Sequence, residues 1–122
     1  TAEGLKTGLA KLKEVRKEFE TELFIPGSKE GLNVELDKAF RLNDFITMGE
    51  LVAYDALNRN ESCGGHFREE YQTEDGEAKR DDQNCFYVSC WEYQGSDDKA
   101  PVMYKEPLKY EAIEVKTRNY KN

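Results

Sequence analysis

Residues 57–80 read LNRNESCGGHFREEYQTEDGEAKR, and this stretch separates two halves of the chain that have different patterns. Before it, apolar residues recur at helical spacing, and after it the sequence is rich in aromatic and β-favouring residues. The stretch contains the only histidine, His66, the glycine pair Gly64-Gly65 and a dense set of charges. Because glycine adopts backbone angles that other residues avoid, the pair predicts an abrupt helix stop followed by a polar crossing.

The same stretch resembles a signature of one flavoprotein family. The run from Arg59 to Glu69, followed by residues 79–82 (KRDD), is similar to the R-K-E-S-R-G-A-H-x-R-x-D and R-D-D runs of that family. The family comprises the flavoprotein subunits of succinate dehydrogenase and fumarate reductase. Residues 32–36 (LNVEL) resemble its L-N-T-E-L helix opening, and residues 91–120 resemble its closing hairpin and tail. The resemblance therefore covers nearly the whole chain.

The resemblance implies a mainly α fold. It predicts a helical bundle, similar to a spectrin repeat without its first helix, followed by an irregular segment with a β-hairpin and an extended tail. Residues 1–60 would form the helical hairpin, and residues 61–122 the polar crossing, β-hairpin and tail of the same domain. The chain departs from the family signature at Cys63, where arginine is usual, and at Gly65, where alanine is usual.

The resemblance also implies a function. The chain would be the C-terminal structural domain of an FAD-dependent subunit that interconverts succinate and fumarate. The parent would pass electrons to an iron–sulfur subunit and a membrane quinone anchor, at the cytoplasmic face of the inner membrane. The family's FAD-binding and catalytic residues lie in upstream domains, so we expect no FAD, no catalytic residue and no activity in this chain alone. Its immediate partner would be the flavin-binding domain of the same chain. The alternatives are the corresponding domain of L-aspartate oxidase and a stand-alone helical or zinc-binding interaction module.

The charged residues of the crossing are predicted to form a paired polar network at a domain junction, because buried charges need partners. Glu61 and Glu69 are the carboxylates expected beside His66 and Arg68. His66 could instead transfer protons at neutral pH, as an acid–base catalyst. The members of the predicted network are Arg59, Glu61, His66, Arg68, Arg80, Asp81 and Asp82.

Cysteines and the histidine allow two other kinds of chemistry. Cys63 and His66, with Cys85 and Cys90, offer four zinc ligands. However, residues five apart on a strand point to opposite faces, so Cys85 and Cys90 would not share an ion. Cys63 lies three residues from His66 and could be an activated nucleophile, but no third orienting group is evident. We therefore predict no zinc site and no catalytic cysteine.

Composition limits the class of partner and the compartment. Of 122 residues, 35% are charged, and the net charge is −7 at pH 7. This balance argues against nucleic acid, because phosphate binding needs clustered basic residues. Three cysteines without a secretory leader predict free thiols in a reducing cytoplasm. We also expect no membrane span, because the apolar runs are short.

Two long helices are predicted before the crossing. The first, from Ala2 to about Leu23, has a charged face on which a surface pair between Arg16 and Glu20 is expected. Asn33 should cap the second helix, which should run to about Asn60. The apolar stripe of the first helix is Leu5, Leu9, Leu12, Val15, Phe19 and Leu23.

The second helix has two neighbouring apolar stripes. The small residues Gly49, Ala53 and Ala56 predict close approach by a neighbouring backbone. The second stripe has no partner in this chain, so we expect the isolated chain to associate with itself. The first stripe is Ala39, Leu42, Ile46, Gly49, Ala53 and Leu57, and the second is Phe45, Met48, Val52 and Ala56.

The last third of the chain is predicted to contain a β-hairpin. Cys85–Tyr93 is rich in aromatic and β-favouring residues, and Val102–Tyr104 would pair with it across a loop at residues 95–98. Beyond Pro107 we expect an extended tail that lies on another surface. Its basic residues are Lys116, Arg118 and Lys121.

Overall fold

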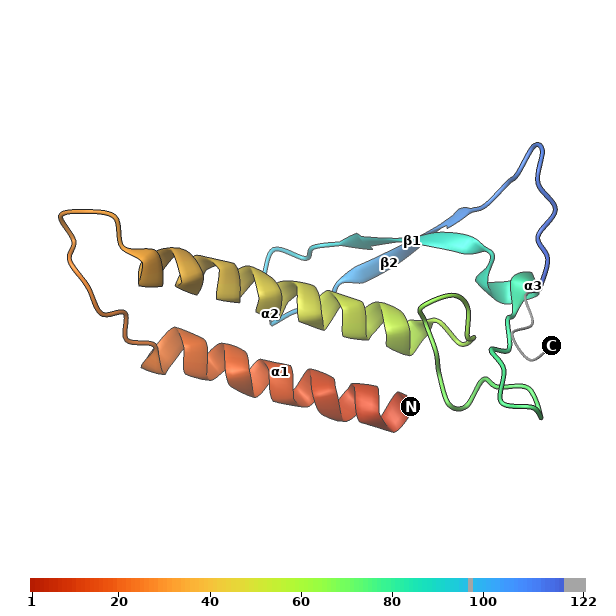
Figure 1. The fold of residues 1–122 in the computed structure, drawn as a ribbon, viewed down its shortest axis with the longest axis horizontal. Helices are drawn as coiled ribbons and strands as arrows, with labels where there is room; N and C mark the ends of the chain where they lie inside the picture. Colours follow the sequence, from red (N-terminus) through yellow and green to blue (C-terminus); the bar gives the residue numbers. More distant parts are fainter. Residues whose placement is uncertain (97, 118–122) are drawn as a thin grey trace. The chain divides into compact units, whose positions relative to one another are not determined.

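The computed structural model describes residues 1–96 and 98–117, and it confirms a mainly helical chain with a β-hairpin (Figure 1). These residues form two compact units, residues 3–54 and residues 1–2 with 55–122, which are described separately below. Within them, no helix combines the length and the apolar content needed to cross a membrane. The elements are α1 (Ala2–Glu22), α2 (Val34–Asn58), α3 (Asp82–Cys85), β1 (Tyr87–Glu92) and β2 (Val102–Pro107).

The first unit is an antiparallel helical hairpin made by α1 and most of α2 (Figure 1). Both long helices end within two residues of the predicted positions. The buried apolar side chains Leu9, Ala39 and Ile46 come from the two predicted interior stripes. Helical periodicity alone therefore predicts this half of the fold.

Asn33 caps α2 as predicted. Its Oδ1 accepts hydrogen bonds from the N–H groups of Glu35 (3.1 Å) and Leu36 (3.2 Å). Its Nδ2 donates to the carbonyl of Pro26 at 3.1 Å, which ties the cap to the preceding loop. Gly27 has φ of 118°, and a Cβ there would lie 2.7 Å from Nδ2 of Asn33. Glycine is therefore required at this position both for its backbone angle and for the space.

Arg16 is the main departure in this unit, because it is buried between the helices instead of lying on the solvated face. It is 7% exposed, and its Nη2 donates to Oε2 of Glu50 at 2.8 Å and to Oγ1 of Thr47 at 3.1 Å. The prediction that Arg16 lies on the solvated face is wrong. Position 16 follows Leu9 by seven residues, which is about two helical turns, so both residues lie on the same buried face. The sequence analysis had assigned the adjacent Val15 to that face instead of Arg16.

The second apolar stripe of α2 is exposed, and Gly49 is not explained by close packing. Phe45, Met48 and Val52 are all more than half exposed. A Cβ added at Gly49 would lie 3.8 Å from the methyl carbons of Leu12, which is an ordinary contact distance. Within the described residues, no backbone atom lies within 4 Å of that Cβ, so the predicted close approach of a backbone to Gly49 is not made by this part of the protein.

The second unit contains α3 and the predicted β-hairpin. Strands β1 and β2 are antiparallel, with Trp91 opposite Met103. Nε1 of Trp91 donates to Oδ1 of Asp55 at 2.9 Å, which joins the hairpin to the last turn of α2. Cys85 is the last residue of α3 and not part of a strand. The argument from opposite strand faces consequently does not apply to Cys85, because its backbone turns before the strand begins.

The segment after the hairpin returns to α3. The N–H of Leu108 donates to the carbonyl of Phe86 at 3.1 Å, and the rings of Phe86 and Tyr110 meet edge to face at 5.5 Å. Arg118 and Lys121, which belong to the predicted basic tail, lie outside the described residues.

Candidate polar site at the end of α2

The end of α2 is closed by side chains from the polar crossing. The last carbonyls of a helix have no partner within the helix, so they need other donors. Nη1 of Arg68 donates to the carbonyls of Ala56 (2.9 Å) and Leu57 (3.3 Å). Nε2 of His66 donates to the carbonyl of Arg59 at 3.0 Å. Two members of the predicted network therefore serve as a C-terminal cap for α2.

Arg68 is held in place by several partners. It is 3% exposed, its Nε donates to Oε2 of Glu70 at 3.1 Å, and its guanidinium lies 5.3 Å from the ring centre of Tyr71. This hydrogen bond, together with one from the N–H of Ala2, lowers the pKa of Glu70 to about 2. The sequence analysis expected Glu69 beside Arg68, but the ion-pair partner of Arg68 is Glu70.

Ser62 connects the two ends of a short loop. It is completely buried, and its Oγ accepts from the N–H of Arg68 at 2.8 Å and donates to the carbonyl of Arg68 at 3.1 Å. The N–H of Ser62 donates to the carbonyl of Lys79 at 2.9 Å. One serine thereby holds together the segments before and after the crossing.

A tight turn lies inside that loop. The main chains of Cys63 and His66 exchange hydrogen bonds of 2.8 and 3.1 Å, and Gly64 has φ of 59°. This left-handed angle favours glycine at Gly64, as predicted, but Gly65 has no positive φ. Because α2 already ends at Asn58, the pair makes a turn within the crossing and does not itself stop the helix. The turn directs His66 toward the end of α2.

Arg59 and Glu61 link the end of α2 to the start of the hairpin. Nη1 of Arg59 donates to Oε1 of Glu61 (2.9 Å) and to the carbonyl of Cys85 (3.1 Å), and its Nη2 donates to the carbonyl of Tyr87 (3.0 Å). Oε2 of the buried Glu61 accepts from the N–H of Asp81 at 2.9 Å. Burial alone would lower the pKa of Arg59, but the Glu61 hydrogen bond and nearby negative charge raise it. Arg59 is therefore a permanent cation.

Asp81, Arg80 and Asp82 continue the network around α3. Oδ1 of Asp81 accepts from the N–H of Asn84 at 3.2 Å and so caps α3. Nε of Arg80 donates to Oδ1 of Asp82 at 2.9 Å, and its Nη1 donates to the carbonyl of Lys116 at 3.1 Å. The hydrogen bond with Asp82 raises the pKa of Arg80. All seven predicted residues thus make structural contacts in one unit.

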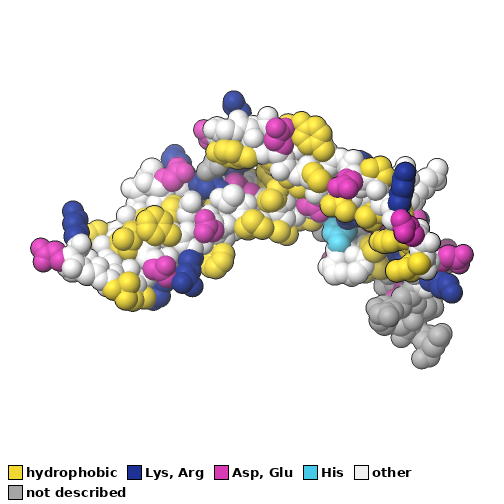
Figure 2. Space-filling view, turned by 90° about the horizontal axis from the view of Figure 1, so that it is seen from above, with side chains coloured by type: hydrophobic (Ala, Val, Ile, Leu, Met, Phe, Trp, Pro, Cys, Tyr) yellow, Lys and Arg dark blue, Asp and Glu magenta, His cyan; other side chains and the backbone are white. Residues whose placement is uncertain are grey.

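The chemical alternatives find little support in this geometry. His66 Nε2 carries a proton and is engaged with a main-chain carbonyl, although part of the ring reaches the surface (Figure 2). Cys85 is buried, and burial raises the pKa of its thiol. All three cysteines are free, and Cys63 and Cys90 are exposed. Across residues 1–96 and 98–117, no three His, Cys, Asp or Glu side chains are placed to hold a metal ion.

Two residues at this site were not anticipated from the sequence. Ser62 carries no charge and was not singled out, although short hydroxyl side chains near helix ends often bond to the local backbone. Glu70 is one of two adjacent glutamates, and sequence alone does not distinguish which of them faces Arg68. The spacing of residues along the sequence therefore did not identify either residue as part of the site.

Comparison with known proteins gives one family and one fold. Residues 1–120 match the family model described as the C-terminal part of the fumarate reductase flavoprotein. Among solved structures, the chain is similar to FrdA of E. coli quinol fumarate reductase, in a variant of that subunit, with 23% identity and a TM-score of 0.74. The similarity covers 93% of this chain and 18% of that chain. This chain therefore spans less than a fifth of the length of FrdA.

Proposed function

The chain belongs to the family of fumarate reductase flavoprotein C-terminal domains, and from this membership we propose that it is the structural C-terminal domain of a succinate- or fumarate-converting flavoprotein subunit. Its role would be to pack against the flavin-binding domain of the same chain. Catalysis would belong to the parent protein, of which this chain is one part.

The observation that supports a structural role is how the family-like motif uses its side chains. His66 and Arg68 donate to main-chain carbonyls at the end of α2, and Arg59 donates to the carbonyl of Cys85 at the end of α3. Glu61 accepts from Arg59 and from the backbone of the crossing. A buried charged group that already has hydrogen-bond partners within the chain stabilises the local structure and is not free to activate a substrate. The motif therefore builds a rigid end to the domain.

The described residues do not suit FAD binding. The three arginines of the crossing are engaged with carbonyls and carboxylates of this chain. We assign FAD to the parent subunit and derive no step of its chemistry from this chain.

The proposed partners follow from the parent protein. The flavin-binding domain of the same chain would cover part of this domain, and an iron–sulfur subunit and membrane quinone anchor would receive the electrons. The complex would work at the cytoplasmic face of the inner membrane. FAD, electron transfer and location are all properties proposed for the parent.

The test compares the complete gene product with the chain of residues 1–122. We expect the complete protein to contain about one flavin per subunit and to oxidise succinate or reduce fumarate with an artificial electron partner. We expect the 122-residue chain to be colourless and inactive in the same assays. A flavin band that stays with the short chain after denaturation and desalting would overturn the structural assignment.

Two other results would replace the proposal with an alternative. A complete protein that oxidises L-aspartate and not succinate would be an L-aspartate oxidase. A complete protein without flavin, containing about one zinc per chain by elemental analysis, would be an interaction module stabilised by metal.

A further inference from the structure

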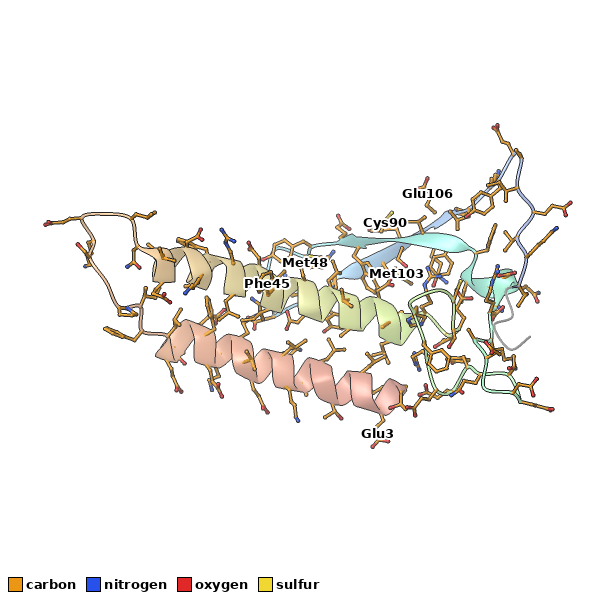
Figure 3. The ribbon with its side chains drawn as sticks, viewed as in Figure 1. Glu3, Phe45, Met48, Cys90, Met103 and Glu106 are labelled. Atoms are coloured by element: carbon orange, nitrogen blue, oxygen red, sulfur yellow. The ribbon has the colours of Figure 1, made fainter. Side chains whose placement is uncertain are left out.

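Arg16 and Glu50 form an ion pair inside the helical hairpin of the first unit. Both residues are buried, and Nη2 of Arg16 donates to Oε2 of Glu50 at 2.8 Å and to Oγ1 of Thr47 at 3.1 Å. Figure 3 shows side chains of α1 and α2 in the space between the two helices. Further domains of the complete protein can only increase this burial. The pair is therefore an internal feature of the hairpin, whatever surrounds the hairpin.

The apolar side chains between the helices do not define how α1 and α2 are aligned along their axes. The buried ones are small or aliphatic, namely Leu9 of α1 and Ala39 and Ile46 of α2. Cores of such side chains tolerate exchange, and they lose a unique arrangement before they lose stability. Residues 23–33 join the helices, and this loop is long enough to follow a shift of one turn, about 5.4 Å.

The ion pair distinguishes one alignment from the others. A shift of α2 by one turn in either direction would bring Ile46 or Tyr54 to the place of Glu50. Neither side chain carries a negative charge at neutral pH, so Arg16 would be buried without a counter-ion. A buried charge without a partner is strongly unfavourable. We propose that the pair of Arg16 and Glu50 fixes the register of the hairpin, which is the alignment of α1 against α2 along their axes.

A register role for a buried polar contact has a physical precedent. In coiled coils a single polar position in an apolar interface specifies the register, at some cost in stability. The inference goes beyond the proposed function and is tested separately from it. Flavin content and turnover of the complete protein decide the proposed function, and the positions at which the two helices can be cross-linked decide the register.

The test places pairs of cysteines in the complete gene product. A Cβ at Gly49 lies 3.8 Å from the methyl carbons of Leu12, so Leu12→Cys with Gly49→Cys reports the observed register by forming a disulfide on mild oxidation. Ala53 lies one turn further along α2, so Leu12→Cys with Ala53→Cys reports a shifted register. Peptide masses identify the linked positions among the other cysteines. With the ion pair intact we expect a link between positions 12 and 49 and none between 12 and 53. Comparable formation of both links would overturn the proposal.

Moving the carboxylate by one turn should move the register with it. Glu50→Leu combined with Tyr54→Glu gives Arg16 a partner when α2 is shifted by four residues and no partner in the observed register. We therefore expect the link between positions 12 and 53 to become the main product in this background. If the link between positions 12 and 49 remains the main product in a helical protein, the apolar contacts set the register and the proposal is refuted.

Exchanging the two charges is the matched control. Arg16→Glu alone buries two carboxylates beside each other, so it should lower the melting temperature of the complete protein, followed by circular dichroism. Adding Glu50→Arg restores an ion pair in the observed register. The double variant should recover most of the lost melting temperature and should again link positions 12 and 49. A double variant that recovers nothing, or that links positions 12 and 53, would contradict the register role even when the variant with the moved carboxylate does not fold.

Discussion

Replacing Arg68 by methionine removes the cap of α2 while keeping most of the apolar volume of the side chain. Nη1 of Arg68 contacts two carbonyls at 2.9 and 3.3 Å, and only the first has good geometry. A hydrogen bond from a charged donor contributes about 1.5–3 kcal/mol, so the first contact accounts for about 2–3 kcal/mol and the second for about 1 kcal/mol. We expect Arg68→Met to lower the free energy of unfolding by about 3–4 kcal/mol. Arg68→Lys keeps the positive charge but loses the planar guanidinium with its several donors, and should lower the free energy of unfolding by about 1–2 kcal/mol.

Urea unfolding followed by circular dichroism measures both variants. If Arg68→Met lies within about 1 kcal/mol of the wild type with an unchanged slope, the cap is unimportant and the reasoning fails. The exposed Glu70 is left out of this sum, and its pH dependence is a separate readout. Its pKa falls from 4.5 to about 2 on folding, so its stabilising effect is present above pH 4.5 and is lost as the pH falls toward 2. Arg68→Met should reduce that acid-dependent loss, because it removes the main cause of the shift.

Three further outcomes follow from the described contacts. Gly49→Ala should raise the free energy of unfolding by about 1 kcal/mol, because a Cβ there meets the facing leucine at an ordinary 3.8 Å; destabilisation on urea unfolding would reveal a clash instead. A thiol reagent should label Cys63 and Cys90 in the native chain but spare the buried Cys85 until the chain unfolds, and a native mass with three labels would contradict this. In the complete flavoprotein, His66→Ala should reduce folding yield or flavin content. Full flavin with turnover reduced more than about a thousandfold would assign His66 a catalytic role.

Helix positions and the hairpin could be predicted from the sequence, because both depend on local spacing. Asn33 marks the start of α2 by a side chain that bonds two and three residues further along, and such caps leave a clear signature. Arg16 shows the limit of the same method. A charged residue at a boundary position is assigned to the solvent, although here Glu50 of the facing helix makes its burial favourable.

The partners in the polar network were harder to predict, because most of them are main-chain carbonyls. Arg59 bonds to the carbonyls of Cys85 and Tyr87, which are 26 and 28 residues away. Every residue has a carbonyl, so no side-chain pattern distinguishes these two positions. The sequence could show which charges need partners, but only the folded backbone shows which atoms satisfy them.

The contacts of the polar crossing also bear on the order in which the chain folds. They form loops within loops: Cys63 with His66, then Ser62 with Arg68, then Ser62 with Lys79, and outermost Arg59 with Tyr87. Each inner closure brings the ends of the next loop closer together, so every step loses only a little more chain entropy. The contacts of the crossing can therefore form stepwise, beginning with its central turn and continuing outward. Contacts that are local in sequence form quickly, so this segment is placed to organise early and to bring β1 to the end of α2.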